Sequence, residues 1–104
     1  MNRNEIWWAR LPEPVGRRPV LLLSRREAYV VRRKIVVAEV TTRVRGLATE
    51  VRVGRPEGLS RTSVVNLESL VTIPKEWLVE RAGTLGRGKV ARVNEALRFA
   101  LEIP

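Results

Sequence analysis

A chain of 104 residues is long enough for one domain with a modest hydrophobic core. It holds no cysteine and no histidine, which excludes disulfides, thiolate metal sites and a histidine general base. Twenty basic against eleven acidic residues give a net charge of +9, and such an excess favours a polyanionic partner, most often nucleic acid.

The N-terminal half of the chain predicts four strands. β-forming residues place the first at Glu5–Leu11, and the turn sequence PEPVG follows it. The continuous apolar character of Pro19–Ser24 predicts a second, buried strand. Ile35–Thr42 and Ala48–Val53 predict the third and fourth strands, and we expect residues 25–34 to be a loop with at most a short turn.

In the third predicted strand, alternation separates an apolar face from a mixed one. One face is uniformly apolar and should point to the core: Val36, Ala38 and Val40. The other face ends in Glu39 and Thr41, which should point to solvent or a groove.

The C-terminal half predicts shorter strands and then helices. Ser63–Asn66 and Leu70–Ile73 are expected to be strands, and Pro74 fits the first turn of a short helix, PKEWLVER. Apolar residues at helical spacing predict a long helix over Lys89–Ile103. Strands followed by one long helix indicate a single mainly β (α+β) domain over residues 1–104, with a strongly bent antiparallel sheet and the helix packed outside.

The residues that could carry chemistry are few. No phosphate-binding glycine loop and no metal-ligand cluster occurs, and the glutamates are scattered. Arginines and hydroxyls remain, although pattern alone favours a solvated charge for Arg18 and an ordinary β-branched strand residue for Thr41. No apolar run reaches the length of a membrane span or a signal peptide, so we expect a cytoplasmic protein without membrane contact.

Five segments, taken in chain order, resemble the MazF/PemK toxins of type II toxin–antitoxin systems: NEIWWARLPE, GRRPVLLLSR, VVAEVTTRVRGLATEVRV, SVVNLESLVTIPKEWL and ALRFAL. The resemblance runs from about residue 4 to residue 102 and implies an SH3-like small barrel of the MazF/PemK/CcdB type. It implies a homodimer that cuts single-stranded RNA at short sequences, without metal or cofactor, leaving a cyclic phosphate and a free 5′ hydroxyl. It also implies a cognate antitoxin as partner, and the short PEPVGR loop resembles the short-loop branch of the family.

The resemblance implies a catalytic pair, Arg18 and Thr41, with Thr42 as a one-residue alternative to the threonine. In the family this pair promotes attack of the ribose 2′-OH on the adjacent phosphate, and an arginine suits the charge that builds on phosphate oxygens. Glu13 is the nearest counterpart of a glutamate sometimes given a catalytic role. Glu39 can serve as a base or shape the groove, and both roles stay open. A further set is expected to contact RNA, with salt bridges or solvated loops as the alternative: Arg17, Arg25, Arg43, Arg45 and Ser69.

Two other functions stay open at this point. The same fold hosts non-catalytic gyrase inhibitors, and a basic barrel could bind RNA without cutting it. Arg18 and Thr41 favour cleavage, because the gyrase inhibitors depend on C-terminal helix residues instead. The supply of three Trp, one Tyr and one Phe is small for a base-stacking platform, which argues against simple binding.

Overall fold

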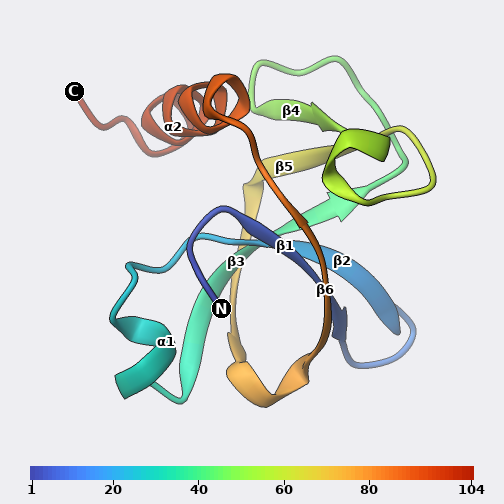
Figure 1. Ribbon diagram of the computed structural model, residues 1–104. Helices are drawn as coiled ribbons and strands as arrows, with labels where there is room; N and C mark the ends of the chain where they lie inside the picture. The colour runs from blue at the N-terminus through green and yellow to red at the C-terminus, as the bar shows by residue number, and fades with distance from the viewer.

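A computed structural model describes residues 1–104, and its centre is a six-stranded antiparallel sheet that curls into a half-barrel (Figure 1). The strand order is β4-β5-β3-β2-β1-β6. The strands are β1 (Glu5–Arg10), β2 (Arg17–Leu22), β3 (Lys34–Thr41), β4 (Glu50–Val53), β5 (Ser63–Pro74) and β6 (Leu78–Thr84). The helices are α1 (Ala28–Val31) and α2 (Arg87–Leu101), and two 3₁₀ turns, η1 (Arg55–Glu57) and η2 (Lys75–Trp77), complete the chain.

The expected mainly β fold with a C-terminal helix is confirmed, but two element predictions are wrong. The segment PKEWLVER is not a helix: only η2 is helical, and β6 starts at Leu78 and pairs with β1. An eight-residue helix has little stability of its own, whereas the free edge of β1 offers a row of backbone hydrogen bonds. Likewise, the two short strands predicted within residues 63–73 are one continuous strand, β5.

The long C-terminal helix lies two residues earlier than the predicted range, because it starts at Arg87 and ends at Leu101. Glu102 adopts the left-handed conformation (φ 54°) that terminates many helices. Val93 and Ala96 are buried, and α2 packs on β4 and β5 (Figure 1). No helix of the structure combines the length and the apolar character that crossing a membrane requires.

The curled sheet holds two hydrophobic clusters, and β3 contributes to both. Ala38 and Val40 belong to the cluster beside α2, as predicted. Ile35 and Val37, on the opposite face, are buried in the second cluster with Tyr29 of α1. The prediction for Val36 is wrong, since it is 36% exposed. Each face of β3 is therefore covered over only half of its length, which simple alternation does not reveal.

β5 turns a corner where it passes β3. Ala38 pairs with Leu70 and Val40 pairs with Val65, so β3 advances by two residues while β5 advances by five. The N–H of Glu68 donates to Asn66 Oδ1 at 3.0 Å, which stabilises the turned segment. The corner, residues 66–69, lies beside Glu39 at the end of β3 that carries the candidate catalytic residues.

Candidate active site

Sheet pairing brings Arg18 and Thr41 together. Val20 of β2 pairs with Glu39 of β3, and the same register carried two residues further sets Arg18 opposite Thr41. On its other side Arg18 pairs with Ala9 of β1. The backbone of Arg18 is thus held by β1, and its side chain lines the same two cavities as Thr41.

Glu39 orients the guanidinium of Arg18. Arg18 Nη1 donates to Glu39 Oε1 at 3.1 Å, and the two side chains are 35% and 32% exposed. The pair therefore lies at the surface of a cleft rather than in the core. The Oε2 atom of Glu39 has no partner in the protein, so the carboxylate could hold Arg18 and still accept another hydrogen bond.

Two cavities share Arg18 and Thr41 as a common wall. The first, about 340 Å³ and here called the polar cavity, has no apolar lining: Arg18, Glu39, Thr41, Arg43, Arg45, Glu50, Asn66 and Ser69. The second, about 250 Å³ and here called the mixed cavity, combines aromatic, apolar and polar groups: Trp8, Arg17, Arg18, Pro19, Val40, Thr41, Thr42, Leu59, Ser60, Arg61 and Ser63. A molecule bound at the Arg18–Thr41 wall can therefore extend into both cavities.

The loop after β3 presents two free cations to the polar cavity. The N–H of Arg43 donates to Thr41 Oγ1 at 3.1 Å, which leaves the hydroxyl proton of Thr41 available to donate elsewhere. Glu50 Oε1 accepts the N–H groups of Arg45 and Gly46 at 3.0 and 2.8 Å, which ties the loop to β4. Neither Arg43 nor Arg45 forms an ion pair, so both guanidinium groups are available for phosphate.

Most of the predicted site residues gather around these cavities, but two do not. Glu13 is exposed in the turn after β1 and lines neither cavity. Arg25 follows the end of β2 opposite to Arg18 and also lines neither. Arg17 lines the mixed cavity, where it lies 4.6 Å from the Trp8 ring centroid and pairs with Glu80 at 2.6 Å. Their roles toward RNA stay predictions.

The chain matches a known protein family over almost its whole length. Residues 2–101 match the family described as the PemK-like, MazF-like toxin of type II toxin–antitoxin system. The chain belongs to this family. Over 102 residues, which are 96% of this chain and 92% of the relative, it is 40% identical to the probable endoribonuclease MazF5 of Mycobacterium tuberculosis. It is 38% identical over 86 residues to endoribonuclease MazF3 of the same organism, covering 83% of this chain and 84% of the relative.

Solved structures agree with this membership. The Mycobacterium tuberculosis toxin MazF-mt6 superimposes with a TM-score of 0.89 at 36% identity, covering 96% of this chain and 98% of the toxin. An endoribonuclease from a mycobacterial species, solved with its cognate antitoxin, shares the fold with a TM-score of 0.87 at 24% identity, covering 100% of this chain and 97% of its own. The expected MazF fold is confirmed, and the expectation of an endoribonuclease is confirmed by the family's curated relatives.

Several lining residues of this MazF-family site were missed by the sequence reasoning. Glu50 and Asn66 complete the polar cavity, and Trp8, Leu59 and Arg61 help to form the mixed one. Asn66 gave a signal, because it interrupts the apolar run of its strand. The loop that carries Leu59 and Arg61 gave none, since its place beside the cleft depends on tertiary contacts such as the close approach of η1 to β6.

Proposed function

We propose that this MazF-family toxin cleaves single-stranded RNA at the wall formed by Arg18 and Thr41. The observation that supports it is the sharing of both residues by two cavities, one polar and one mixed. A strand of RNA crossing the wall would present one phosphate to Arg18 and Thr41 and one nucleotide to each cavity. We further propose that a cognate protein antitoxin blocks this cleft, since the chain belongs to a family of type II toxin–antitoxin systems.

In the proposed reaction the RNA supplies its own nucleophile. The 2′ oxygen forms a bond to the adjacent phosphorus, and the bond from phosphorus to the 5′ oxygen breaks. The 2′-OH proton leaves to a base, and the departing 5′ oxygen takes up a proton, giving a 2′,3′-cyclic phosphate and a 5′-OH end. Arg18 stabilises the charge that builds on the non-bridging oxygens, and Thr41 positions the phosphate with its free hydroxyl proton.

Glu39 has two possible roles here, and one substitution separates them. As a base it would take the 2′-OH proton through Oε2; as a positioning residue it would only hold Arg18 through Oε1. Glu39→Gln keeps an oxygen that accepts from Arg18 but removes the basic carboxylate. A rate loss of about 100-fold assigns the base role, and a loss of only a few-fold assigns positioning.

We also propose that the reaction needs no metal ion. Every one of the eleven acidic residues is a glutamate, and no group of three or more possible metal ligands among them lies together. Within the polar cavity Glu39 is engaged by Arg18 and Glu50 by backbone N–H groups. Cleavage should therefore persist in excess EDTA. Activity that disappears on chelation and returns with magnesium would overturn this mechanism.

We also propose a short-loop connection of the family type and a homodimeric assembly. Only six residues, 11–16, separate β1 from β2, and this short connection supports our proposal that the chain belongs to the short-loop branch. We expect a homodimer, since a domain of this size gains buried area by pairing. Light scattering at micromolar concentration should give twice the monomer mass of 11.8 kDa, and the monomer mass would count against the dimer.

The decisive experiment compares binding with single-turnover cleavage, after the cut position has been mapped on a long RNA. Arg18→Ala should bind RNA nearly as the wild type does and cut about 100-fold or more slowly. Thr41→Val keeps the β-branched shape, removes the hydroxyl and should also cut slowly, whereas the matched Thr42→Val should not. Arg43→Ala should cut normally at saturation but bind more weakly as salt rises.

Three results of this experiment would contradict parts of the proposed function. An Arg18→Ala protein that cuts at the wild-type rate once saturated would remove Arg18 from the chemistry. RNA that is bound by the wild type but never cut would leave a basic barrel that only binds RNA. New 5′ ends that carry phosphate rather than hydroxyl would contradict attack by the 2′-OH.

A further inference from the structure

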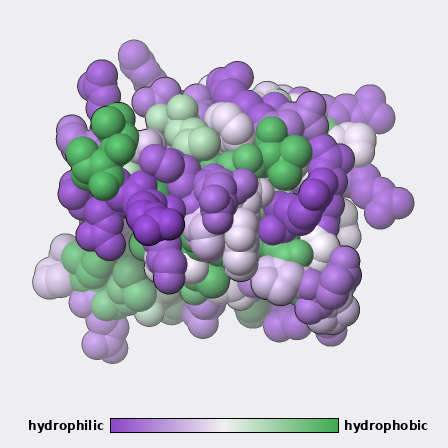
Figure 2. Space-filling model, turned by 90° about the horizontal axis from the view of Figure 1, so that it is seen from below, coloured by the Kyte–Doolittle hydropathy of each residue, from purple (hydrophilic) through white to green (hydrophobic).

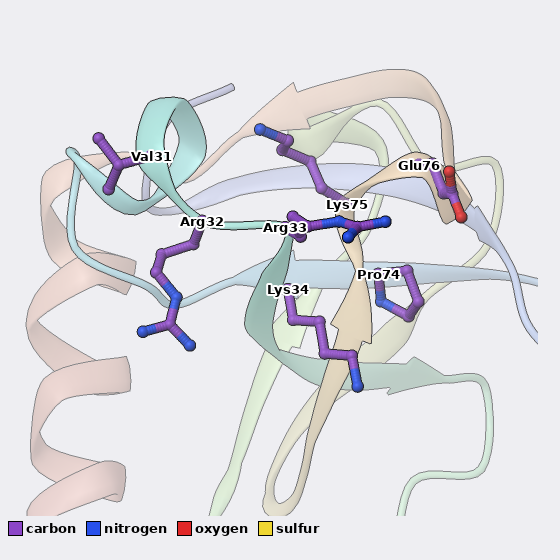
Figure 3. A pocket seen from close by; sticks show the side chains of 7 residues that line it. All are labelled: Val31, Arg32, Arg33, Lys34, Pro74, Lys75 and Glu76. Carbon is purple, nitrogen blue, oxygen red and sulfur yellow. The ribbon is translucent and has the colours of Figure 1, made fainter.

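A third cavity lies at the opposite end of β3 from Arg18 and Thr41 (Figure 3). It has a volume of about 600 Å³ and is here called the basic cavity: Val31, Arg32, Arg33, Lys34, Pro74, Lys75 and Glu76 line it. These residues come from the end of α1, the start of β3 and the junction of β5 with η2. Segments that are far apart in the sequence thus converge on one basic site.

The cations of the basic cavity have no acidic partners. Arg32, Arg33, Lys34 and Lys75 form no ion pair, and the one carboxylate of the lining, Glu76, forms none either. Four cations against one anion leave a local charge of +3 in this lining. Such crowding of like charge is unfavourable in the free protein, and a bound polyanion would relieve it.

The backbone beneath these cations is fixed. Lys34 pairs with Pro74 at the end of the β3–β5 ladder, and the N–H of Lys75 donates to the carbonyl of Arg33 at 2.8 Å. The N–H of Arg32 caps α1 through the carbonyl of Ala28 at 2.9 Å. The side chains therefore start from rigid positions, so less ordering is needed when a ligand binds.

Lys75 differs from the other three cations. Its Nζ donates to the carbonyl of Tyr29 at 2.9 Å, which ties η2 to α1 and gives this lysine a structural role. Figure 3 shows its side chain directed toward α1, while Arg32 and Lys34 extend away from it. Arg32, Arg33 and Lys34 are exposed and remain free for a ligand.

The lining indicates phosphate groups rather than bases or apolar side chains. No aromatic ring lines the cavity, so a base has nothing to stack on, and the only non-polar members are Val31 and Pro74. Seen from the α1 end, hydrophilic side chains predominate and apolar groups form separate patches (Figure 2). Contacts of this kind hold a nucleic acid by its backbone and carry no sequence information.

We propose that the basic cavity binds backbone phosphates of the same RNA that is cut at the Arg18–Thr41 wall, several nucleotides away from the cut. β3 has eight residues, so its two ends are roughly 23 Å apart. RNA that reaches only the cleavage cavities would miss this site, while longer RNA would engage it. The inference rests on the proposed function, and it adds a sequence-independent preference for long substrates.

The test compares a triple variant, Arg32→Gln/Arg33→Gln/Lys34→Gln, with a matched control, Arg87→Gln/Arg92→Gln/Arg98→Gln. The control removes the same charge from exposed α2 positions that form no ion pair. Cleavage is measured on an RNA of about 6 nucleotides around the mapped cut and on one of about 20. Binding is measured on the same lengths with 2′-O-methyl RNA, which lacks the nucleophile and stays intact.

The wild type and the control should cut the longer RNA with a higher kcat/KM than the short one. The triple variant should cut the short RNA as the wild type does and lose the preference for length. Three lost phosphate contacts should lower the salt slope for the longer RNA by about 2.1, or about 0.7 for each contact. The wild type binds the longer RNA more tightly than the triple variant does, and this difference in affinity should shrink about 18-fold when the salt is raised from 50 to 200 mM.

Two results would overturn the proposal. In the first, the triple variant keeps the wild-type length preference and salt slope. In the second, RNA length has no effect but polyglutamate binds the wild type and not the variant, which would assign the cavity to an acidic protein segment. If the wild type binds both RNAs but cuts neither, the proposed function fails, and the 2′-O-methyl titrations still decide on the basic cavity.

Discussion

The contact between η1 and β6 leaves no room for a side chain, and this predicts a large effect for Gly83→Ala. A Cβ at Gly83 would lie 2.7 Å from the carbonyl carbon of Glu57 and closer still to its oxygen, where ordinary contacts are 3.4–4 Å. The obstacle is backbone, so it cannot rotate away. Either β6 or η1 must move by roughly 0.7 Å or more for the methyl group to fit.

η1 is poorly placed to move. Glu57 is buried, with its side chain 4% exposed, and it accepts from the N–H of Gly54 at 2.7 Å and from Lys89 Nζ at 2.8 Å. Displacement of η1 strains this capping bond and ion pair together. We expect Gly83→Ala to lower the free energy of unfolding by about 3 kcal/mol, out of the roughly 5–15 kcal/mol typical of a domain of this size.

Urea denaturation at fixed protein concentration measures the effect, because any self-association would make the midpoint concentration-dependent. Gly88→Ala is the matched control. Nothing lies within 4 Å of a Cβ at Gly88, which is inside α2, so alanine should stabilise by about 0.5–1 kcal/mol. A Gly83→Ala protein within about 0.5 kcal/mol of the wild type would refute the close-contact argument.

Three further predictions concern buried groups of the fold. Burial raises the pKa of Tyr29 to about 12, so between pH 10 and pH 12 the phenol proton is released mainly from the unfolded chain. The free energy of unfolding should therefore fall by about 2 kcal/mol over this range. Urea midpoints measured against pH should show this fall in the wild type, and the Tyr29→Phe variant should lack it. Lys89→Met leaves the buried carboxylate of Glu57 unpaired and should cost about 3 kcal/mol, part of which the double variant with Glu57→Gln should restore. Val37→Ala should cost about 2 kcal/mol and Val36→Ala less than about 0.5 kcal/mol, and equal costs would contradict the half-covered faces of β3.

The sequence predicted the elements that a local residue pattern marks. Apolar periodicity located α2 within two residues, and the β-forming runs located β1 to β4. It failed at β6, because the pairing of residues 78–84 depends on the free edge of β1, some 70 residues away in the chain. It failed at Val36 because the curl of the sheet, and not alternation, decides which half of each face is covered.

The candidate site was predicted only where a family resemblance supplied it. Composition and spacing gave Arg18 and Thr41 no advantage over any other arginine or threonine. Their juxtaposition comes from the β2–β3 register, and the walls around them come from the η1 loop and the β5 corner. Contacts between segments that are far apart in the sequence produce no periodic pattern of residues, so they could not be predicted from the sequence.

The β5 corner has a consequence for how such toxins can diverge. On either side of Glu68 and Ser69 the strand registers are fixed by buried residues, where loss of one residue would turn every following side chain to the wrong face. Within the corner, Leu67 is buried in the core, but Glu68 and Ser69 pair with neither neighbouring strand and are not buried, so a gain or loss of a residue at these two positions leaves both ladders intact. Asn66 and Ser69 line the polar cavity from this segment. Evolution can therefore reshape one wall of the cleft by changes in length, independently of the core and of Arg18 and Thr41.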